Sequence, residues 1–259
     1  MIKDNLHEIN SKLPSDVTLV AVSKFHPVER LMEAYNAGQR VFAESRPQEL
    51  AAKVPQMPAD VQWHFIGHLQ TNKLKLVLPY VSLVQSVDSL HLLQAISTWA
   101  VAHNKVIDVL LELHLGAEQT KQGFSENEIM TIISGAGISS QTHGHPRPCK
   151  REGPTAASSD ALRVGRGRSE AEAVCEDIPA PMKGVRIRGL MGMASNTEDR
   201  AQVEGEFARI EALYKRIKAS GMEGFDTLSI GMSGDWPLAV QHGATMVRIG
   251  TDIFGPREY

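Results

Sequence analysis

Short apolar runs recur along the chain, and most of them lack polar residues at alternate positions. Runs of this kind predict strands that are buried on both faces of a sheet. We expect eight such strands, at residues 17–23, 40–45, 63–67, 81–89, 106–115, 185–193, 226–233 and 245–255.

The segments between these runs have the periodicity of helices. "PVERLMEAYNAG" places Pro27 at a first-turn position and ends at Gly38. The segment 197–221 ends at Gly221 and repeats apolar residues at helical spacing, namely Phe207, Ile210, Leu213 and Ile217. A further helix, from about Ile2 to Leu13, precedes the first strand.

Strict alternation of buried strands with helices predicts parallel strand-helix-strand units. Eight such units in a chain of 259 residues predict an α/β fold, a single (β/α)8 TIM-like barrel with an extra N-terminal helix. The alternative is an open doubly wound sheet, which normally has a Gly-rich turn after its first strand. The corresponding segment here, "SKFHP", contains no glycine.

One segment, residues 135–183, interrupts this alternation. It is rich in Gly, Pro, Ser, Arg and Ala and has no aromatic residue. Unstructured connections of this length are uncommon within compact domains. We therefore expect an irregular or disordered insertion between the fifth and sixth units of a single domain spanning residues 1–259.

Composition limits the partners and the compartment. The formal net charge of −3 and the pI near 6.4 disfavour nucleic acids and anionic membranes. No apolar stretch is long enough for a signal peptide or a membrane span, which predicts a soluble cytoplasmic protein. Cys149 and Cys175 form no C-x-x-C motif, as suits a reducing compartment.

A lysine, Lys24, stands where the first apolar run ends. In a parallel barrel the functional side chains lie at the carboxyl ends of the strands, although an exposed lysine is also common at such a place. Barrels often bind phosphate in the loops after strands seven and eight, where this chain has Ser233 and Gly234, and Gly250 and Thr251. A lysine facing a phosphate site suits a phosphorylated aldehyde cofactor held as a Schiff base.

Seven motifs stand in order along the chain: "AVSKFHP", "WHFIGHLQTNK", "SVDS", "EQTKQGF", "RIRGLMGMA", "TLSIGMSGDW" and "GATMVRIGTDIFGPREY". Together they resemble the pyridoxal phosphate homeostasis proteins, which are single-domain relatives of the alanine racemase barrel. The resemblance covers nearly the whole chain except residues 135–183.

This resemblance implies pyridoxal 5'-phosphate (PLP) as the cofactor, bound to Lys24 as a Schiff base. It implies that Arg248 faces the pyridine nitrogen and that the phosphate is held by Ser233, Gly234, Gly250 and Thr251. It also implies auxiliary places for Lys121, which would affect how PLP reaches or leaves Lys24, and for His64 and Met193.

The second predicted strand departs from the family pattern. The family reads F-G-E-N there, whereas this chain has Ala43 and Ser45 in place of the glycine and the asparagine, followed by Pro47. Ser45 can still donate one hydrogen bond towards the PLP ring oxygen, but it lacks the second polar group of the amide. His114 stands where many relatives carry asparagine.

The residues favour a carrier over an enzyme. An arginine at the pyridine nitrogen can only donate a hydrogen bond, so the ring stays unprotonated and is a weaker electron sink. Racemases with this arrangement also need a tyrosine, and no tyrosine lies at a predicted strand end among Tyr35, Tyr80, Tyr214 and Tyr259. We expect a non-catalytic protein that buffers PLP or delivers it to PLP-dependent apoenzymes, as a monomer or weak dimer.

Two other functions stay open from sequence. One is a PLP enzyme with weak amino-acid racemase or decarboxylase activity. The other is a barrel enzyme for a phosphorylated sugar or nucleotide, in which Lys24 binds a phosphate or a carbonyl group. Lys73 and Lys121 also follow predicted strands, so either could compete with Lys24 for the aldehyde.

We expect no metal site and no role in RNA binding. His64 and His68 are four residues apart, but on a strand and loop they would not share a face. The potential ligands His143, His145, Cys149 and Cys175 are irregularly spaced. "GMSGD" lacks the last glycine of the G-x-S-x-G nucleophile elbow, so we do not expect a hydrolase. "RVGRGR" has no aromatic residues interleaved for base stacking, so we interpret it as a solvated basic stretch.

Overall fold

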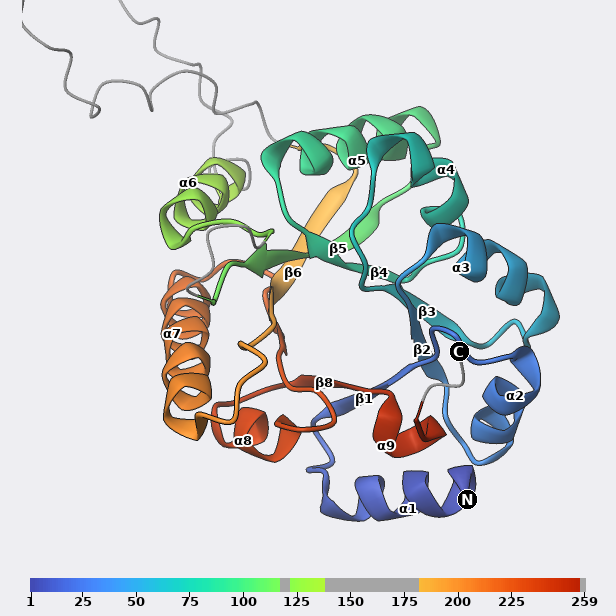
Figure 1. The fold of residues 1–259 in the computed structure, drawn as a ribbon. Helices are drawn as coiled ribbons and strands as arrows, with labels where there is room; N and C mark the ends of the chain where they lie inside the picture. The colour runs from blue at the N-terminus through green and yellow to red at the C-terminus, as the bar shows by residue number, and fades with distance from the viewer. Residues whose placement is uncertain (117–121, 138–181, 257–259) are drawn as a thin grey trace, which may run out of the picture.

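Eight parallel strands close into a barrel in the computed structural model, which describes residues 1–116, 122–137 and 182–256. Figure 1 shows the strands as a central ring with the helices outside it. The strands are β1 (Thr18–Val22), β2 (Val41–Glu44), β3 (Gln62–Phe65), β4 (Leu83–Val87), β5 (Ile107–Leu113), β6 (Val185–Gly192), β7 (Thr227–Ser229) and β8 (Met246–Ile249). The predicted (β/α)8 barrel is confirmed, and the open doubly wound alternative is wrong.

The barrel closes because β8 pairs with both β7 and β1. Ala21 of β1 is in register with Ile249 of β8, and Val22 is in register with Ala43 of β2. The loops that follow β7, β8 and β1 are therefore neighbours at the carboxyl end of the barrel, and this end is called the mouth below.

Helices surround the barrel within the described ranges. They are α1 (Ile2–Lys12), α2 (Val28–Asn36), α3 (Pro47–Lys53), α4 (Leu74–Val77), α5 (Leu90–Ala102), α6 (Glu126–Gly137), α7 (Arg200–Ala219), α8 (Trp236–Gln241) and α9 (Thr251–Phe254), with 3-10 turns η1 (Val54–Gln56) and η2 (Thr71–Lys73). The extra N-terminal helix is confirmed: α1 lies against α2 and α9, and the Asn5 side chain donates to the Ile253 carbonyl at 3.0 Å. Among the described helices, none has the length and apolar character needed to cross a membrane.

Alternate residues of the strands pack into two separate clusters. A small cluster fills the inside of the barrel and contains Val20, Ala43, Leu83, Leu110, Met191 and Met246. Their neighbours along the strands, such as Leu19, Phe42 and Leu111, pack in the large cluster shared with the helices. The runs are therefore apolar on both faces, which is the reason they lack an alternating pattern.

Two strands end at least four residues earlier than predicted, β7 at Ser229 and β8 at Ile249. The last apolar run continues to Gly255, but β8 ends at Ile249 and the buried Ile253 and Phe254 belong to α9. Periodicity cannot separate one helical turn from the end of a strand. After β7, Asp235 is the N-cap of α8, so Ser233 and Gly234 lie in the loop that precedes that helix.

The predicted insertion starts three residues too early. Residues 135–137 are the end of α6, and the next described strand, β6, starts at Val185. The insertion therefore lies between the fifth and sixth units, as predicted. Its residues 138–181 lie outside the described part of the chain.

Candidate functional site

Lys24 lies two residues beyond β1, at the mouth, and its side chain is half-buried. The next residue, Phe25, has a φ of 69°, a left-handed conformation that is uncommon outside glycine. The chain therefore turns sharply just after Lys24. This turn separates the strand from α2, which begins at Val28.

Arg248 is the buried cation inside the barrel, projecting from β8. Its Nη1 donates to the Ser229 carbonyl at 2.7 Å and to Ser229 Oγ at 2.6 Å, and its Nη2 donates to the Gly192 carbonyl at 2.8 Å. Burial lowers the pKa of Arg248 to about 10, so the guanidinium is still protonated at neutral pH. Nε is the guanidinium nitrogen for which the described residues supply no acceptor.

A chain of hydrogen bonds extends from Arg248 to His64 on β3. Ser229 Oγ donates to Gln85 Oε1 at 2.7 Å, and Gln85 Nε2 lies 2.9 Å from His64 Nδ1. Burial lowers the pKa of His64 to about 4, so the ring is neutral at pH 7. Nδ1 then accepts from the glutamine amide and Nε2 carries the proton. His64 is thus linked to Arg248 through two neutral side chains.

Glu112 of β5 is a buried carboxyl group in the same interior. Burial and the nearby Asp88 raise its pKa to about 7, although Arg248 and His68 act in the opposite direction. His68 Nδ1 in turn lies 2.9 Å from Asp88 Oδ2. The interior therefore holds a permanent cation next to an acid that is about half ionised at neutral pH.

Glutamine at position 112 should flatten the pH dependence of stability. A carboxyl pKa raised from 4.5 to about 7 means that the folded protein binds more protons than the unfolded chain in that window. The contribution of Glu112 to the stability of the wild type should therefore fall as pH rises from about 4.5 to 7. Urea denaturation of PLP-free protein should show about 1–3 kcal/mol less of this decline in Glu112→Gln. An unchanged decline would contradict the buried, protonated state of Glu112.

The loops after β7 and β8 contact each other at the mouth. The Asp252 backbone N–H donates to Ser233 Oγ at 3.4 Å, and the Arg248 backbone N–H donates to the Gly231 carbonyl at 3.0 Å. Gly250 lies close to β1, since a Cβ there would be 3.2 Å from the Val22 carbonyl oxygen. Thr251 is the first residue of α9, and within this turn the N–H groups of Ile253 and Phe254 donate to the Gly250 carbonyl. The structure thus brings together the four residues predicted to hold a phosphate.

Ser45 follows β2 and is half-buried at the rim of the mouth. Its carbonyl lies against Gly67 after β3, where a Cβ would be 2.1 Å from that oxygen. Ala43, at the other departure from the family pattern, is fully buried in the barrel interior. The extra methyl group at position 43 is accommodated as part of the core.

Alanine at position 67 should force these two loops apart, because its Cβ would clash with the backbone carbonyl of Ser45, which cannot turn away as a side chain could. We expect Gly67→Ala to destabilise the fold by about 1–3 kcal/mol, measured by urea denaturation. Gly205→Ala on α7 is the matched control, since a Cβ there meets nothing within 4 Å. The control should be neutral or slightly stabilising. Equal effects of the two substitutions would contradict the close approach of Ser45 and Gly67.

The remaining predicted residues lie as follows. Met193 follows β6 with its side chain exposed, and Lys73 ends η2. Lys121 lies outside the described residues. Of the tyrosines, Tyr35 and Tyr214 are on α2 and α7, Tyr80 is exposed after α4, and Tyr259 is outside the described ranges.

The described part of the chain holds no group of three or more His, Cys, Asp or Glu side chains that could bind a metal ion. His64 is inside the barrel, whereas His68 is exposed and pairs with Asp88. His143, His145, Cys149 and Cys175 lie outside the described residues, so the prediction for them is untested.

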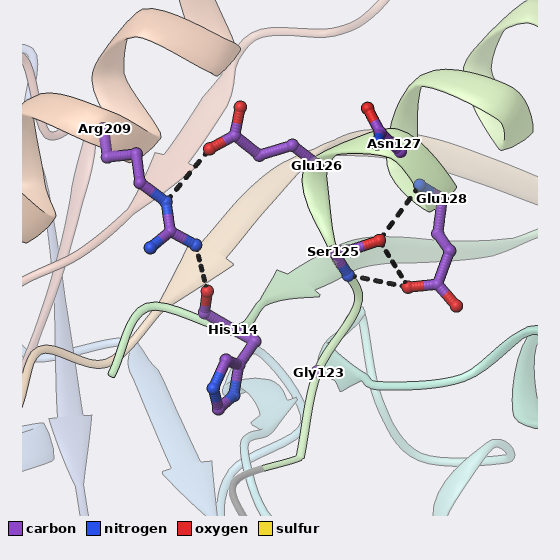
Figure 2. Close-up of a pocket in the computed structure, with 7 residues that line it drawn as sticks. All are labelled: His114, Gly123, Ser125, Glu126, Asn127, Glu128 and Arg209. Carbon is purple, nitrogen blue, oxygen red and sulfur yellow. Dashed lines mark hydrogen bonds and ion pairs between the residues drawn. The ribbon is translucent and has the colours of Figure 1, made fainter. Parts of the chain in front are cut away.

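A cavity of about 640 Å³ lies beside the end of β5, between α6 and α7 (Figure 2). Arg209 Nε donates to Glu126 Oε1 at 3.0 Å, and its Nη2 donates to the His114 carbonyl. Ser125 and Glu128 form a capping box at the start of α6. Because these polar groups bind one another, we assign no ligand to this cavity.

A buried group of charged side chains behind β1 was not predicted from the sequence. Lys53 of α3 donates to Glu44 Oε1 at 2.7 Å and to Glu49 Oε2 at 3.2 Å. Burial raises the pKa of Glu44 to about 7 despite Lys53 and Ser23. A glutamate ending an apolar strand and a Glu–Lys pair at i, i+4 were the available signals.

The closed barrel, the lysine after β1 and the arginine on β8 define a barrel of the alanine racemase N-terminal domain class. The family model "Alanine racemase, N-terminal domain" matches residues 1–139 and 156–258. A pyridoxal phosphate homeostasis protein of Vibrio alginolyticus is 30% identical over all of this chain and 98% of its own length. The one of Pasteurella multocida is 32% identical over 95% of this chain and 88% of its length. The chain belongs to the family of pyridoxal phosphate homeostasis proteins.

Solved structures agree with this assignment. PipY of Synechococcus elongatus PCC7942 is 29% identical, and this chain covers all of it with a TM-score of 0.77 without PLP and 0.75 with PLP bound. An alanine racemase of Clostridium difficile has a TM-score of 0.68 at 13% identity, and this chain covers 57% of it. The racemase thus shares the barrel fold. The predicted family resemblance is confirmed.

Proposed function

We propose that this protein binds PLP as a Schiff base on Lys24 and buffers or delivers the cofactor in the cytoplasm, with one barrel as the binding domain. The observation that carries this proposal is the position of β8 between β1 and β7. This strand order places Lys24, Arg248 and the loops after β7 and β8 on one side of the mouth. PipY, which shares 29% identity with this chain, has been solved with PLP bound.

The loops after β7 and β8 suit a phosphate group. The bond from Asp252 to Ser233 holds the two loops together, and Thr251 at the first position of α9 brings a backbone N–H and a hydroxyl to the same place. Gly250 allows the chain to run close to β1, where a side chain would crowd the Val22 carbonyl. Ser233, Gly234, Gly250 and Thr251 would hold the phosphate through backbone N–H groups and hydroxyls.

Arg248 suits the pyridine nitrogen of the cofactor. Two of its nitrogens are held by Ser229 and Gly192, which leaves Nε to donate to a ligand. Because Arg248 stays protonated, it can only donate and does not protonate the ring. The bonds from His64 through Gln85 to Ser229 keep this guanidinium in place. His64 thus acts at a distance from the cofactor.

PLP supplies an aldehyde that condenses with an amine and a ring that withdraws electrons from it. Lys24 supplies the amine, and Arg248 keeps the ring a weak electron sink. Both features favour a protein that holds the cofactor over one that turns over amino acids. Ser45, Met193 and Lys121 complete the proposed surroundings, with Lys121 acting on entry or release, and PLP-dependent apoenzymes are the proposed recipients.

Addition of PLP to the purified protein tests this function. A Schiff-base absorbance band that saturates at one PLP per chain is expected. No band at any PLP concentration would contradict Schiff-base formation and favour a barrel enzyme for a phosphorylated sugar or nucleotide.

A second function, weak racemase or decarboxylase activity, is favoured by Glu112 alone. A carboxyl group with a pKa of about 7 has the protonation behaviour of a general acid or base. Incubation of the PLP-loaded protein with amino acids in D2O separates the two functions. A carrier leaves the Cα proton in place, whereas an enzyme exchanges it for deuterium.

A further inference from the structure

The buried charged group behind β1, called the α3 ion cluster, consists of Glu44, Glu49 and Lys53. It lies between the barrel wall and α3, on the outer side of β1 and β2. Glu44 is fully buried and Lys53 is 7% exposed. Lys53 Nζ donates to both carboxylates and also, at 2.9 Å, to the carbonyl of Ser23.

Each member of the cluster holds the chain on one side of Lys24. Before Lys24, the Ser23 carbonyl accepts from Lys53, and Ser23 Oγ donates to Glu44 Oε1 at 2.7 Å. After Lys24, the backbone N–H of Phe25 donates to Glu49 Oε2 at 3.0 Å. These three bonds fix the peptide groups on both sides of the lysine.

The cluster also sets the direction of the lysine side chain. Ser23 points outwards to Glu44, and successive side chains of an extended chain point to opposite faces. Lys24 is therefore directed towards the inner side of the barrel. Directly after Lys24, Phe25 has a left-handed conformation and its N–H is held by Glu49. The guanidinium carbon of Arg46 lies 4.3 Å from the centroid of the Phe25 ring.

Stability alone does not account for such a cluster. A buried ion pair is often no more stabilising than apolar residues of the same volume, because both charges lose their hydration. Here Glu44 Oε2 is buried without a hydrogen-bond partner among the described residues, which adds to the desolvation cost. What the charges provide is strong, directional hydrogen bonds to the chain around Lys24.

We propose that Glu49 and Lys53 are positioning residues for Lys24, which fix the backbone around it so that its amine faces the cofactor at the mouth. Glu44 holds Lys53 in place for this task. This inference rests on the proposed function, in which Lys24 carries PLP.

Variants at position 49 test the inference, because Glu49 is the least buried member of the cluster. Glu49→Leu removes the acceptor for the Phe25 N–H, whereas Glu49→Gln keeps an amide oxygen there. Glu49→Leu should weaken PLP binding, followed by the Schiff-base absorbance, about tenfold and slow its formation. Glu49→Gln should stay within about threefold of the wild type, and Lys53→Met should behave like Glu49→Leu.

A control separates positioning from loss of stability. Leu93 is fully buried on α5, which packs on β5 and β6, so Leu93→Ala should lower the melting temperature without weakening PLP binding. If folded Glu49→Leu binds PLP as tightly and as fast as the wild type, the inference is overturned. Absence of a Schiff base in the wild type would instead refute the proposed function.

Discussion

Alanine in place of Lys24 should abolish the Schiff-base absorbance of the protein with PLP. In the proposed function the amine of Lys24 condenses with the aldehyde, and the neighbouring amine of Lys53 is held on the outer side of β1 by Glu44 and Glu49. The expected effect is complete loss of the covalent band, with weak non-covalent PLP binding through the phosphate loops. Titration with PLP, monitored by absorbance, measures it.

Two lysines serve as matched controls for this result. Lys73 ends η2 after β3, and Lys121 follows β5 in the sequence. Lys73→Ala and Lys121→Ala should both keep the band, although Lys121→Ala should alter the rate at which PLP enters or leaves. If the band survives in Lys24→Ala and disappears in either control, the aldehyde is held by that other lysine.

Methionine at position 248 should destabilise the protein by about 3–5 kcal/mol at neutral pH. The substitution leaves the carbonyls of Ser229 and Gly192 without their buried donor, and it removes the cation that partly offsets the raised pKa of Glu112. The pKa of Glu112 should therefore rise further. Urea denaturation measures the loss, and PLP titration should show weaker binding with a changed spectrum.

The pH dependence distinguishes this account of Arg248 from simple loss of packing. Because a protonated Glu112 no longer needs the cation, Arg248→Met should lose less stability at pH 5 than at pH 8. Lys12→Met, which removes an exposed ion pair with Glu8, is the control and should cost less than about 1 kcal/mol. A loss for Arg248→Met that is equal at both pH values would contradict the coupling to Glu112.

The fold was largely predictable because each strand of a closed parallel barrel is buried on both faces. Apolar runs such as 17–23 and 81–89 could therefore be recognised without any alternation. The errors fall where one turn of helix follows a strand directly. Thr251–Phe254 is such a case, since its buried apolar residues continue the pattern of β8.

The candidate site was predictable in part. Lys24 and the glycine and serine residues of the last two loops follow from the general geometry of barrels, and Arg248 followed only from the family resemblance. The α3 ion cluster followed neither from the geometry of barrels nor from the family resemblance, because its bonds join the end of a strand, a helix and the chain around Lys24. The Glu49–Lys53 pair at i, i+4 spacing was visible in sequence, but nothing local indicated that it would bind the chain around Lys24.

The interior network gives a physical reason for the proposed carrier function. Arg248 is fixed by Ser229, Gly192 and the chain to His64, so its charge cannot leave the barrel. A fixed donor that never protonates the ring holds the cofactor without activating it. The neutral state of His64 keeps a second positive charge out of the same interior.

Borohydride reduction of the protein with bound PLP tests the central claim most directly. Reduction converts a Schiff base into a stable secondary amine, and peptide mass spectrometry then locates the modified lysine. The account predicts the phosphopyridoxyl mass on the peptide that contains Lys24, at one per chain. Modification of another lysine, or no modification at all, would contradict it.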